Sequence, residues 1–337
     1  MKIAVLLGGT SSERKVSLAS GTAIAQALNN LKHNVILLDP AYGRNQKIES
    51  IDQVGLMPPE LEELKKLPAE QGKALFELVE LISEQKFDIV FNALHGGIGE
   101  NGVMQSLFEA ARIKYTGSRV MASALAMNKV ISKQVFLSCG VPTAEFLFYR
   151  KGADFSVVQK EILSKFTVPL VVKPNEEGST VGLTIVKADS ELEQAWNKAA
   201  VYGDILVERY IAGRELTVTV VGEKALPVVE IIPEGGFYDY EHKYTKGKTN
   251  YVCPAEIPAE VAEEAKRYAV RAFQGLMCSA YARIDFRLSE KNELFCLEVN
   301  TLPGMTATSL VPKAAKAEGM EFEELIQKIV TLSMGGN

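Results

Sequence analysis

Two segments near the C-terminal end of the chain read as strands, and they constrain its fold more than any other part of the sequence. One is YARIDFRL at 281–288, and the other is LFCLEVN at 294–300. Side chains two positions apart leave a strand on the same face. If the two strands pair, one face of the sheet therefore carries Arg283, Asp285, Glu298 and Asn300. The residues between them are apolar, which predicts that the sheet is covered by other elements.

The polar face of this strand pair predicts a metal site. Two carboxylates and an amide oxygen are hard ligands, and they suit Mg²⁺ that keeps several waters and shares its coordination with substrate phosphates. The alternative is a pair of edge strands whose charged residues only face water. We expect the metal site, with Asp285, Glu298 and Asn300 as ligands and Arg283 as a fixed cation beside them, because a covered sheet rarely carries acids without a role.

Size and composition limit the classes of protein to which the chain can belong. With 337 residues it is long for one core, so two or three domains are expected. Its net charge of −5 lacks the basic footprint that nonspecific nucleic-acid binding needs. The four cysteines are far apart and form no CxxC pair, which predicts reduced thiols. No segment reaches membrane-spanning length, and we expect a cytoplasmic protein without membrane insertion.

The first third of the chain alternates strand and helix patterns, as a parallel doubly wound sheet does. Strands are predicted at 2–7, 35–38 and 88–91, and glycine loops lead from the first and third strands into helices. Functional groups of such sheets collect at the carboxyl ends of the strands, so Glu13 and His95 are expected near a ligand. His33 and His242 are expected at the surface, and the polar stretch 41–67 is interpreted as an excursion from the sheet.

Beyond residue 117 the pattern changes. The expected elements are helices at 120–127 and 129–139, strands at 170–173, 183–186 and 205–208, and a helix at 190–202 with Ser190 as its N-cap. A strand-rich part follows from residue 214, and then a helix at 259–275, the two strands described above and two terminal helices.

The loop KPNEEGSTVG at 173–182 joins two predicted strands. Lys173 can hold a phosphate as a point charge, and the glycine, serine and threonine add donors. The order of a P-loop is absent, and the loop leads into a strand, so a flexible turn with a surface lysine is an open alternative. Glu208, at the end of the strand 205–208, can accept hydrogen bonds from ribose hydroxyls, or it is an exposed strand end.

The stretch 234–253 has the composition of a lid. It combines the pair Gly235-Gly236 with three lysines and with Tyr238, Tyr240, Tyr244 and Tyr251, and long loops inside compact domains often close over a ligand. A disordered surface loop is the alternative. The sequence has no GxSxG motif and no convincing Ser-His-Asp or Cys-His pairing, which argues against a covalent mechanism.

Nine motifs, taken together and in order, resemble those of the D-alanine–D-alanine ligases of the ATP-grasp superfamily. They are LLGGTSSERKVSL from Leu6, ALHGGIGENG from Ala93, YTGS from Tyr115, MNK from Met127, VVKPNEEGSTVG from Val171, VERYIAGRELTV from Val207, FYDYEHKY from Phe237, ARIDF from Ala282 and LEVNTLPGMTATSLVP from Leu297. The resemblance implies an α/β ATP-grasp fold with a Rossmann-like domain at 1–117, a central subdomain at 118–208 and a catalytic domain at 209–337.

The activity implied by the resemblance is the ATP-dependent ligation of two D-alanines for peptidoglycan precursor synthesis. ATP phosphorylates the carboxylate of the first D-alanine, and the amine of the second attacks the acyl phosphate through a tetrahedral intermediate. Asp285, Glu298 and Asn300 would hold two Mg²⁺ ions, with Mn²⁺ as a possible substitute. Arg283 would stabilise the oxyanion of the intermediate.

The remaining roles implied by the resemblance concern the nucleotide and the two D-alanines. Lys129, Lys173 and Lys243 resemble contacts to nucleotide and phosphate, and Glu208 and Glu215 resemble contacts to adenine and ribose. Glu13 would bind the ammonium of the first D-alanine and would close the lid together with Ser179 and Tyr244. The parts that resemble the site of the second D-alanine are Gly304, Ser309 and Leu310.

The chain also departs from the family pattern. The phosphate loop carries Asn175 and Glu176 where relatives often have Ser-Arg, which removes a possible cation, whereas Lys243-Tyr244 fits a D-alanine acceptor. The family implies a homodimer. Two alternatives stay open: another ATP-grasp carboxylate–amine ligase that makes a different dipeptide or depsipeptide, and a noncatalytic nucleotide-binding protein.

Overall fold

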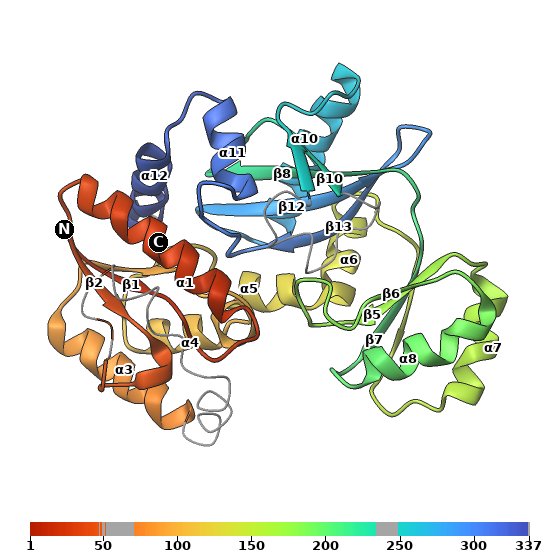
Figure 1. Ribbon diagram of the computed structural model, residues 1–337, viewed down its shortest axis with the longest axis horizontal. Coiled ribbons are helices and arrows are strands. Elements are labelled where there is room, and N and C mark those ends of the chain that lie inside the picture. Colours follow the sequence, from red (N-terminus) through yellow and green to blue (C-terminus); the bar gives the residue numbers. More distant parts are fainter. Residues whose placement is uncertain (47, 49–50, 52–70, 234–248, 336–337) are drawn as a thin grey trace.

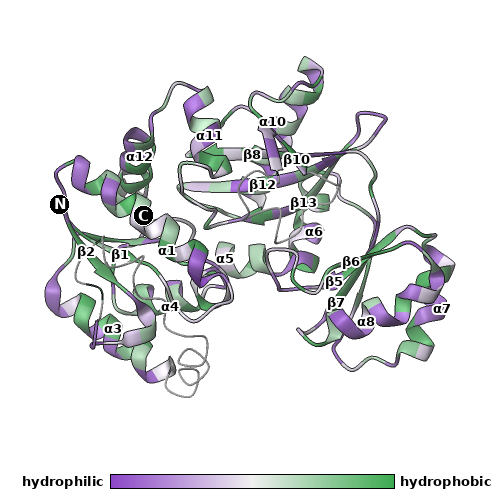
Figure 2. Ribbon diagram, viewed as in Figure 1, coloured by the Kyte–Doolittle hydropathy of each residue, from purple (hydrophilic) through white to green (hydrophobic). Residues whose placement is uncertain are grey.

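Three sheets with covering helices form the part of the chain that the computed structural model describes, namely residues 1–46, 48, 51, 71–233 and 249–335 (Figure 1). Most of the expected excursion at 41–67 and most of the expected lid lie outside these residues. Figure 2 shows hydrophobic residues along the strands of the first and middle sheets, whereas the helices around them have hydrophilic outer faces. None of the described helices combines the length and the apolar composition that crossing a membrane requires.

The first sheet is parallel, as the sequence predicted, with the order β2-β1-β3. Its strands are β1 (Lys2–Leu6), β2 (Asn34–Leu38) and β3 (Ile89–Asn92). Successive residues of β1 alternate between two cores: Ile3 and Val5 face one, and Ala4 and Leu6 face the other. The first core is covered by α1 (Arg14–Asn30), and the second is covered by α3 (Gln71–Gln85) and α4 (Val103–Ala110).

The middle sheet is antiparallel and has the order β4-β7-β5-β6. Its strands are β4 (Phe146–Tyr149), β5 (Leu170–Pro174), β6 (Thr184–Val186) and β7 (Ile205–Arg209). The helices α7 (Phe155–Lys165) and α8 (Leu192–Ala200) cover one face. The prediction of Ser190 as N-cap was wrong, because Ser190 lies within a 3₁₀ turn, η4 (Asp189–Glu191), and Glu191 caps α8. The strand β4 and the helix α7 were not predicted from the sequence.

The C-terminal sheet has the order β11-β10-β8-β12-β13, with the short β9 paired to β8. Its strands are β8 (Arg214–Val221), β9 (Lys224–Ala225), β10 (Val229–Pro233), β11 (Thr249–Val252), β12 (Tyr281–Leu288) and β13 (Leu294–Asn300). One face packs on α10 (Ala259–Gly275), and Ile284 and Phe286 enter this core beside Phe273. The opposite face is therefore the one that carries the polar residues of β12 and β13.

Two helices near residue 130 affect how the chain divides into units. These helices, α5 (Val120–Met127) and α6 (Lys129–Ser138), lie inside the range expected for the central subdomain. However, Ala126 and Phe136 pack in the core of the C-terminal sheet. We therefore propose that the central unit begins after residue 141 and that residues 120–141 belong physically to the C-terminal unit.

The chain returns to its first unit at the end. After α11 (Leu310–Ala317), the last helix, α12 (Phe322–Gly335), packs against α1. Its residues Leu325, Ile326 and Ile329 are buried in the same core as Ile3 and Val5. In Figure 1 the two ends of the chain accordingly lie on the same lobe.

Candidate active site

The two strands identified first in the sequence are neighbours, as expected. β12 and β13 pair so that Arg283 lies opposite Asn300 and Asp285 opposite Glu298. Two nitrogens of Arg283 donate to the Asp285 carboxylate at 2.9 and 2.8 Å, the Asn300 amide donates to it at 3.0 Å and the Thr217 hydroxyl at 2.6 Å. Because β12 is an interior strand and Asp285 is buried, the alternative of two solvated edge strands is wrong.

The chemistry of these donors fits a hard cation. Nowhere in the described part of the chain do three or more His, Cys, Asp or Glu residues gather into a metal-binding group, so the set reaches three ligands only by including the amide oxygen of Asn300. Carboxylate and amide oxygens suit Mg²⁺, which also takes waters and phosphate oxygens. The Asp285 carboxylate already accepts four hydrogen bonds, so a cation on it would displace one of the donors.

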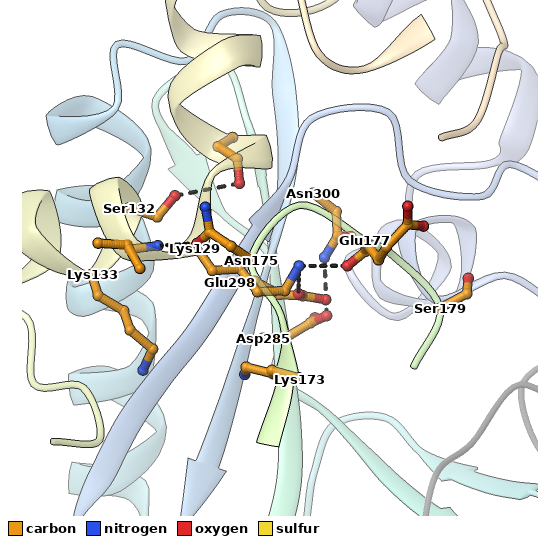
Figure 3. Close-up of polar contacts among 12 residues, drawn as sticks. Lys129, Ser132, Lys133, Lys173, Asn175, Glu177, Ser179, Asp285, Glu298 and Asn300 are labelled. Carbon is orange, nitrogen blue, oxygen red and sulfur yellow. Dashed lines mark hydrogen bonds and ion pairs between the residues drawn. The ribbon is translucent and has the colours of Figure 1, made fainter. Parts of the chain in front are cut away.

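Lys129 joins the phosphate loop to this polar face. Its ammonium donates to the backbone carbonyl of Glu177 at 2.6 Å and lies 3.6 Å from a carboxylate oxygen of Glu298 (Figure 3). Burial lowers the pKa of Lys129, although the charge of Glu298 opposes this effect. The lysine that begins α6 is thereby placed between two segments that the sequence predicted to hold phosphate and metal.

Lys173 and Glu208 form a buried ion pair, with the ammonium 2.5 Å from one carboxylate oxygen. Glu208 is 3% exposed and Lys173 is 7% exposed, so the alternatives of an exposed strand end and a surface lysine are wrong. The other oxygen of Glu208 lies 2.8 Å from Lys133, which the sequence analysis did not identify. Burial raises the pKa of Glu208, but Lys133 and Lys173 outweigh this effect and bring the pKa to about 2.

A cleft between the middle and C-terminal sheets is lined by these residues. Val171, Lys173 and Glu208 form one wall, Asp285 and Leu297 form the other, and the loop 177–181 borders it. Glu215 also lines the cleft, where its carboxylate lies 3.5 Å from Arg287. The cleft thus combines apolar side chains with a set of charged groups, a combination that suits a nucleotide.

A second cavity, of about 850 Å³, lies between the first unit and the C-terminal sheet. Glu13 and His95 reach it from the loops that follow β1 and β3, and Ser179 reaches it from the phosphate loop. The Ser179 hydroxyl donates to the Glu13 carboxylate, and Arg283 and Asn300 form the opposite wall. These residues are far apart in sequence, and the fold brings them together as expected.

Two titratable groups lie at the N-terminal wall of this second cavity, the buried His95 and the half-buried Glu100. Burial lowers the pKa of His95, and the carboxylate of Glu13 opposes this effect. Burial and the neighbouring charge of Glu13 raise the pKa of Glu100 to about 8. The Glu100 carboxylate accepts hydrogen bonds from the backbone N–H groups of Gly96 at 2.7 Å and of Leu302 at 3.3 Å. It therefore links the first unit to the segment that follows β13. Sequence analysis missed it, although it lies five residues after His95 in the same glycine-rich motif.

The residues expected around the second D-alanine gather at the start of α11. Ser309 is the N-cap of this helix, and its hydroxyl accepts from the backbone of Thr306 at 2.9 Å. A Cβ atom on Gly304 would lie 3.0 Å from the Ser309 hydroxyl, so the chain passes close to it. Gly304, Ser309 and Leu310 all line the second cavity.

The remaining site predictions, Lys243 and Tyr244, lie outside the described residues, and so does His242. The segment that contains them begins after Pro233, which pairs with Thr249 across β10 and β11. Thr249, Asn250 and Tyr251 line the second cavity, so the C-terminal flank of this segment borders the candidate substrate site.

Comparison with known proteins agrees with this geometry. Residues 2–118 match the family model for the N-terminus of D-Ala-D-Ala ligases, and residues 135–331 match the one for the C-terminus. The D-alanine–D-alanine ligase of Moorella thermoacetica is 41% identical over 99% of each chain, and that of Syntrophotalea carbinolica is 41% identical over 98% of this chain and 95% of its own. The chain belongs to the D-alanine–D-alanine ligase family.

Solved structures of D-alanine–D-alanine ligases and of a related enzyme share the fold. The D-alanine–D-alanine ligase of Bacillus anthracis superposes with a TM-score of 0.78 and 30% identity over 99% of this chain and 97% of its own. The VanG D-Ala:D-Ser ligase of Enterococcus faecalis gives 0.81 and 29% over 98% of this chain and 99% of its own. Both likenesses cover nearly all of each chain, so the ATP-grasp fold expected for the D-alanine–D-alanine ligase family is confirmed.

Proposed function

We propose that this chain uses ATP to join two molecules of D-alanine into D-alanyl-D-alanine, a step of peptidoglycan precursor synthesis. The observation that carries the proposal is that the two cavities meet: Gly178, Ser179 and Glu298 line both. A nucleotide in the first cavity would therefore direct its terminal phosphate toward a carboxylate held in the second. Phosphoryl transfer between the two needs this proximity.

In the first step the chain's role is to hold the phosphates and the first D-alanine. Lys129 and Lys173 would contact the phosphates, and Glu208 and Glu215 would contact adenine and ribose; all four line the first cavity. Glu13 would accept hydrogen bonds from the ammonium of D-alanine, beside His95. Two Mg²⁺ ions, or Mn²⁺ in their place, would be held by Asp285, Glu298 and Asn300 and would neutralise charge on the phosphates.

In the second step the amine of the second D-alanine, having lost a proton to solvent, adds to the acyl carbon, and the tetrahedral intermediate then forms the peptide bond as the bond from carbon to the phosphate oxygen breaks and phosphate leaves. The carboxylate of this D-alanine would be bound by Ser309 and by backbone N–H groups at the start of α11, beside Gly304 and Leu310. Arg283 would donate to the oxyanion of the tetrahedral intermediate. Arg283 lines the second cavity together with Glu13 and Ser309.

The lid residues, the quaternary structure and the cellular location complete the proposal. Tyr244 would join Glu13 and Ser179 in closing the site, and Lys243 would contact phosphate. We propose a homodimer that works in the cytoplasm, as the family resemblance implies. Sedimentation of the purified protein at twice the mass of one chain would support the dimer, and sedimentation at the mass of one chain would contradict it.

Substrate-dependent phosphate release tests the proposed activity. With ATP and Mg²⁺, the protein should release phosphate when D-alanine is added and should not do so with L-alanine or D-lactate. A D-serine arm is needed because a D-Ala:D-Ser ligase shares the fold. Release with D-serine plus D-alanine that exceeds release with D-alanine alone would favour the alternative of a different dipeptide ligase. Release with none of these substrates would contradict the proposal.

A further inference from the structure

Lys133 is a fully buried lysine next to the nucleotide cleft. It comes from the middle of α6, and its exposed fraction is 0%. Its ammonium lies 2.8 Å from Glu208, 2.7 Å from the hydroxyl of Thr143 and 3.5 Å from the carbonyl of Ala144. Figure 3 shows Lys133 and Lys173 in the region where α6 approaches the sheets. The proposed roles of Lys129, Lys173 and Glu208 give Lys133 no function.

The neighbours of Lys133 hold it in place from several sides. The hydroxyl of Thr143 accepts from Lys133 and in turn donates to the carbonyl of Cys296 on β13 at 2.7 Å. The ring of Phe146, on β4, lies 5.6 Å from the ammonium. Phe146 is also the cross-strand partner of Glu208. Lys133 therefore ties the middle sheet to the C-terminal unit at the base of the cleft.

Glu208 is shared between two lysines that differ in their access to the nucleotide. Lys173 lines the cleft, whereas Lys133 lies behind its wall. Each lysine approaches a different oxygen of the carboxylate. If Lys173 turns toward a phosphate, Lys133 still neutralises Glu208, and the buried carboxylate is not left without a counter-charge.

We propose that Lys133 is a positioning residue for the nucleotide. It keeps Glu208 ionised and in place as a hydrogen-bond acceptor, so that the ammonium of Lys173 can leave Glu208 and contact the phosphates of ATP. The inference rests on the proposed function, because it takes the cleft to be the ATP site. It predicts that Lys133 affects ATP through Glu208 and has little effect on D-alanine, whose proposed contacts lie in the other cavity.

Lys133→Met removes the charge and keeps most of the apolar volume. We expect the dissociation constant of ATP, measured by calorimetry in the presence of Mg²⁺, to rise roughly tenfold, the size of one charge-assisted hydrogen bond. KM for ATP should rise with it, whereas KM for D-alanine at saturating ATP should change less than twofold. An unchanged ATP affinity, or an equal loss for both substrates, would overturn the proposal.

A double-mutant cycle with Glu208→Gln shows whether Lys133 acts through that residue. If it does, the double variant loses no more ATP affinity than Glu208→Gln alone; losses that multiply would contradict the proposal. Thr143→Val is the packing control, since it removes a hydrogen bond to Lys133 and leaves the charge. It should bind ATP within twofold of wild type, and a loss equal to that of Lys133→Met would show that packing, not charge, is responsible.

The Lys133→Gln variant and ATP binding by the wild-type protein complete the test of Lys133. If Lys133→Met does not fold, Lys133→Gln replaces it in the same cycle, because Gln can still donate to Thr143 without carrying charge. Wild-type affinity for ATP in Lys133→Gln would also overturn the proposal. The wild-type protein separates the two levels of inference: if it does not bind ATP, the proposed function fails, whereas binding that Lys133 does not influence contradicts only the positioning role.

Discussion

The charged residues of the candidate site form ion pairs with one another in this structure. Arg283 holds Asp285 through two hydrogen bonds, Lys173 lies on Glu208, and Lys129 lies near Glu298. Each pair joins a cation proposed to contact anionic substrate groups to an acid proposed to contact metal or nucleotide. When substrates bind, each of these residues would exchange its present ion-pair partner for a group of the substrate or metal. No charge would then stay buried without a partner, which limits the free-energy cost of desolvating it.

Glu298→Gln tests the metal site at the level of one residue. The change removes an anionic ligand and leaves an oxygen of similar size, so the protein should fold normally and bind metal at least tenfold more weakly. Mn²⁺ binding in the presence of ADP, followed by water-proton relaxation, measures this loss directly, and activity should fall with it. Mn²⁺ affinity equal to that of the wild type would show that Glu298 is not a ligand.

Glu100 should make stability depend on pH. Its raised pKa, about 8 against 4.5 for the free side chain, means that the folded protein keeps a proton that the unfolded chain loses. This contribution to stability is complete below about pH 4.5 and is lost as the pH rises through about 8. The Glu100→Gln variant lacks this contribution. The difference between the free energies of unfolding of the wild type and the variant should therefore fall by roughly 1–4 kcal/mol as the pH rises from 5 to 9. A difference independent of pH, measured by urea unfolding, would show that Glu100 ionises normally.

At the scale of the structural elements, the loops after β1 and β3 bring Glu13 within reach of the other cavity walls. Gly96 has φ of +69°, and a Cβ atom there would lie 2.7 Å from a carboxylate oxygen of Glu13. Gly152, in the loop after β4, has φ of +85° and no atom within 4 Å of such a Cβ. Both glycines thus have a positive φ, but of these two only Gly96 lies against Glu13, which lines the second cavity.

Substituting these glycines separates backbone strain from effects on the site. Gly96→Ala and Gly152→Ala should each lose about 1–3 kcal/mol of stability, because both place a side chain on backbone with a positive φ. Only Gly96→Ala should also raise KM for D-alanine, since it displaces Glu13. The two variants are compared by thermal unfolding and by steady-state kinetics with D-alanine, and equal KM values in both would remove Glu13 from the proposed ammonium site.

Elements with strong local signals could be predicted from the sequence. The bounds of α5 and α10 agree with the predicted 120–127 and 259–275, and the i, i+2 spacing of Asp285 and of Glu298 predicted the shared face correctly. β4 was missed because FLFY is short and lacks alternation, and its pairing with β7 depends on residues about sixty positions away. The burial of Lys133 and the position of Glu100 beside Glu13 were also not predictable, because they depend on elements from distant parts of the chain.

At the scale of the whole molecule, the first unit depends on the last helix. Ile329 of α12 is completely buried in the core that also contains Ile3 and Val5 of β1. Ile329→Ala should cost about 2–5 kcal/mol. Amide hydrogens of β1 and β3, more than two hundred residues away in sequence, should then exchange faster. Phe76→Ala, at a side chain that is 62% exposed, is the control and should leave this exchange unchanged. Faster exchange confined to α12 would mean that the helix is not part of the first unit's core.

The return of α12 to the first unit also bears on how the chain is made. A ribosome releases β1, α1 and β2 long before residues 322–335, which finish covering their core. During translation the first sheet therefore keeps apolar surface exposed until α12 is released, whereas the middle sheet can close as soon as β7 is released, because its four strands and two helices are contiguous in sequence. Newly made chains should thus be most dependent on chaperones at their N-terminal end, and a transcript truncated before codon 322 should yield a product that cells degrade, even though the residues proposed for catalysis are all encoded upstream.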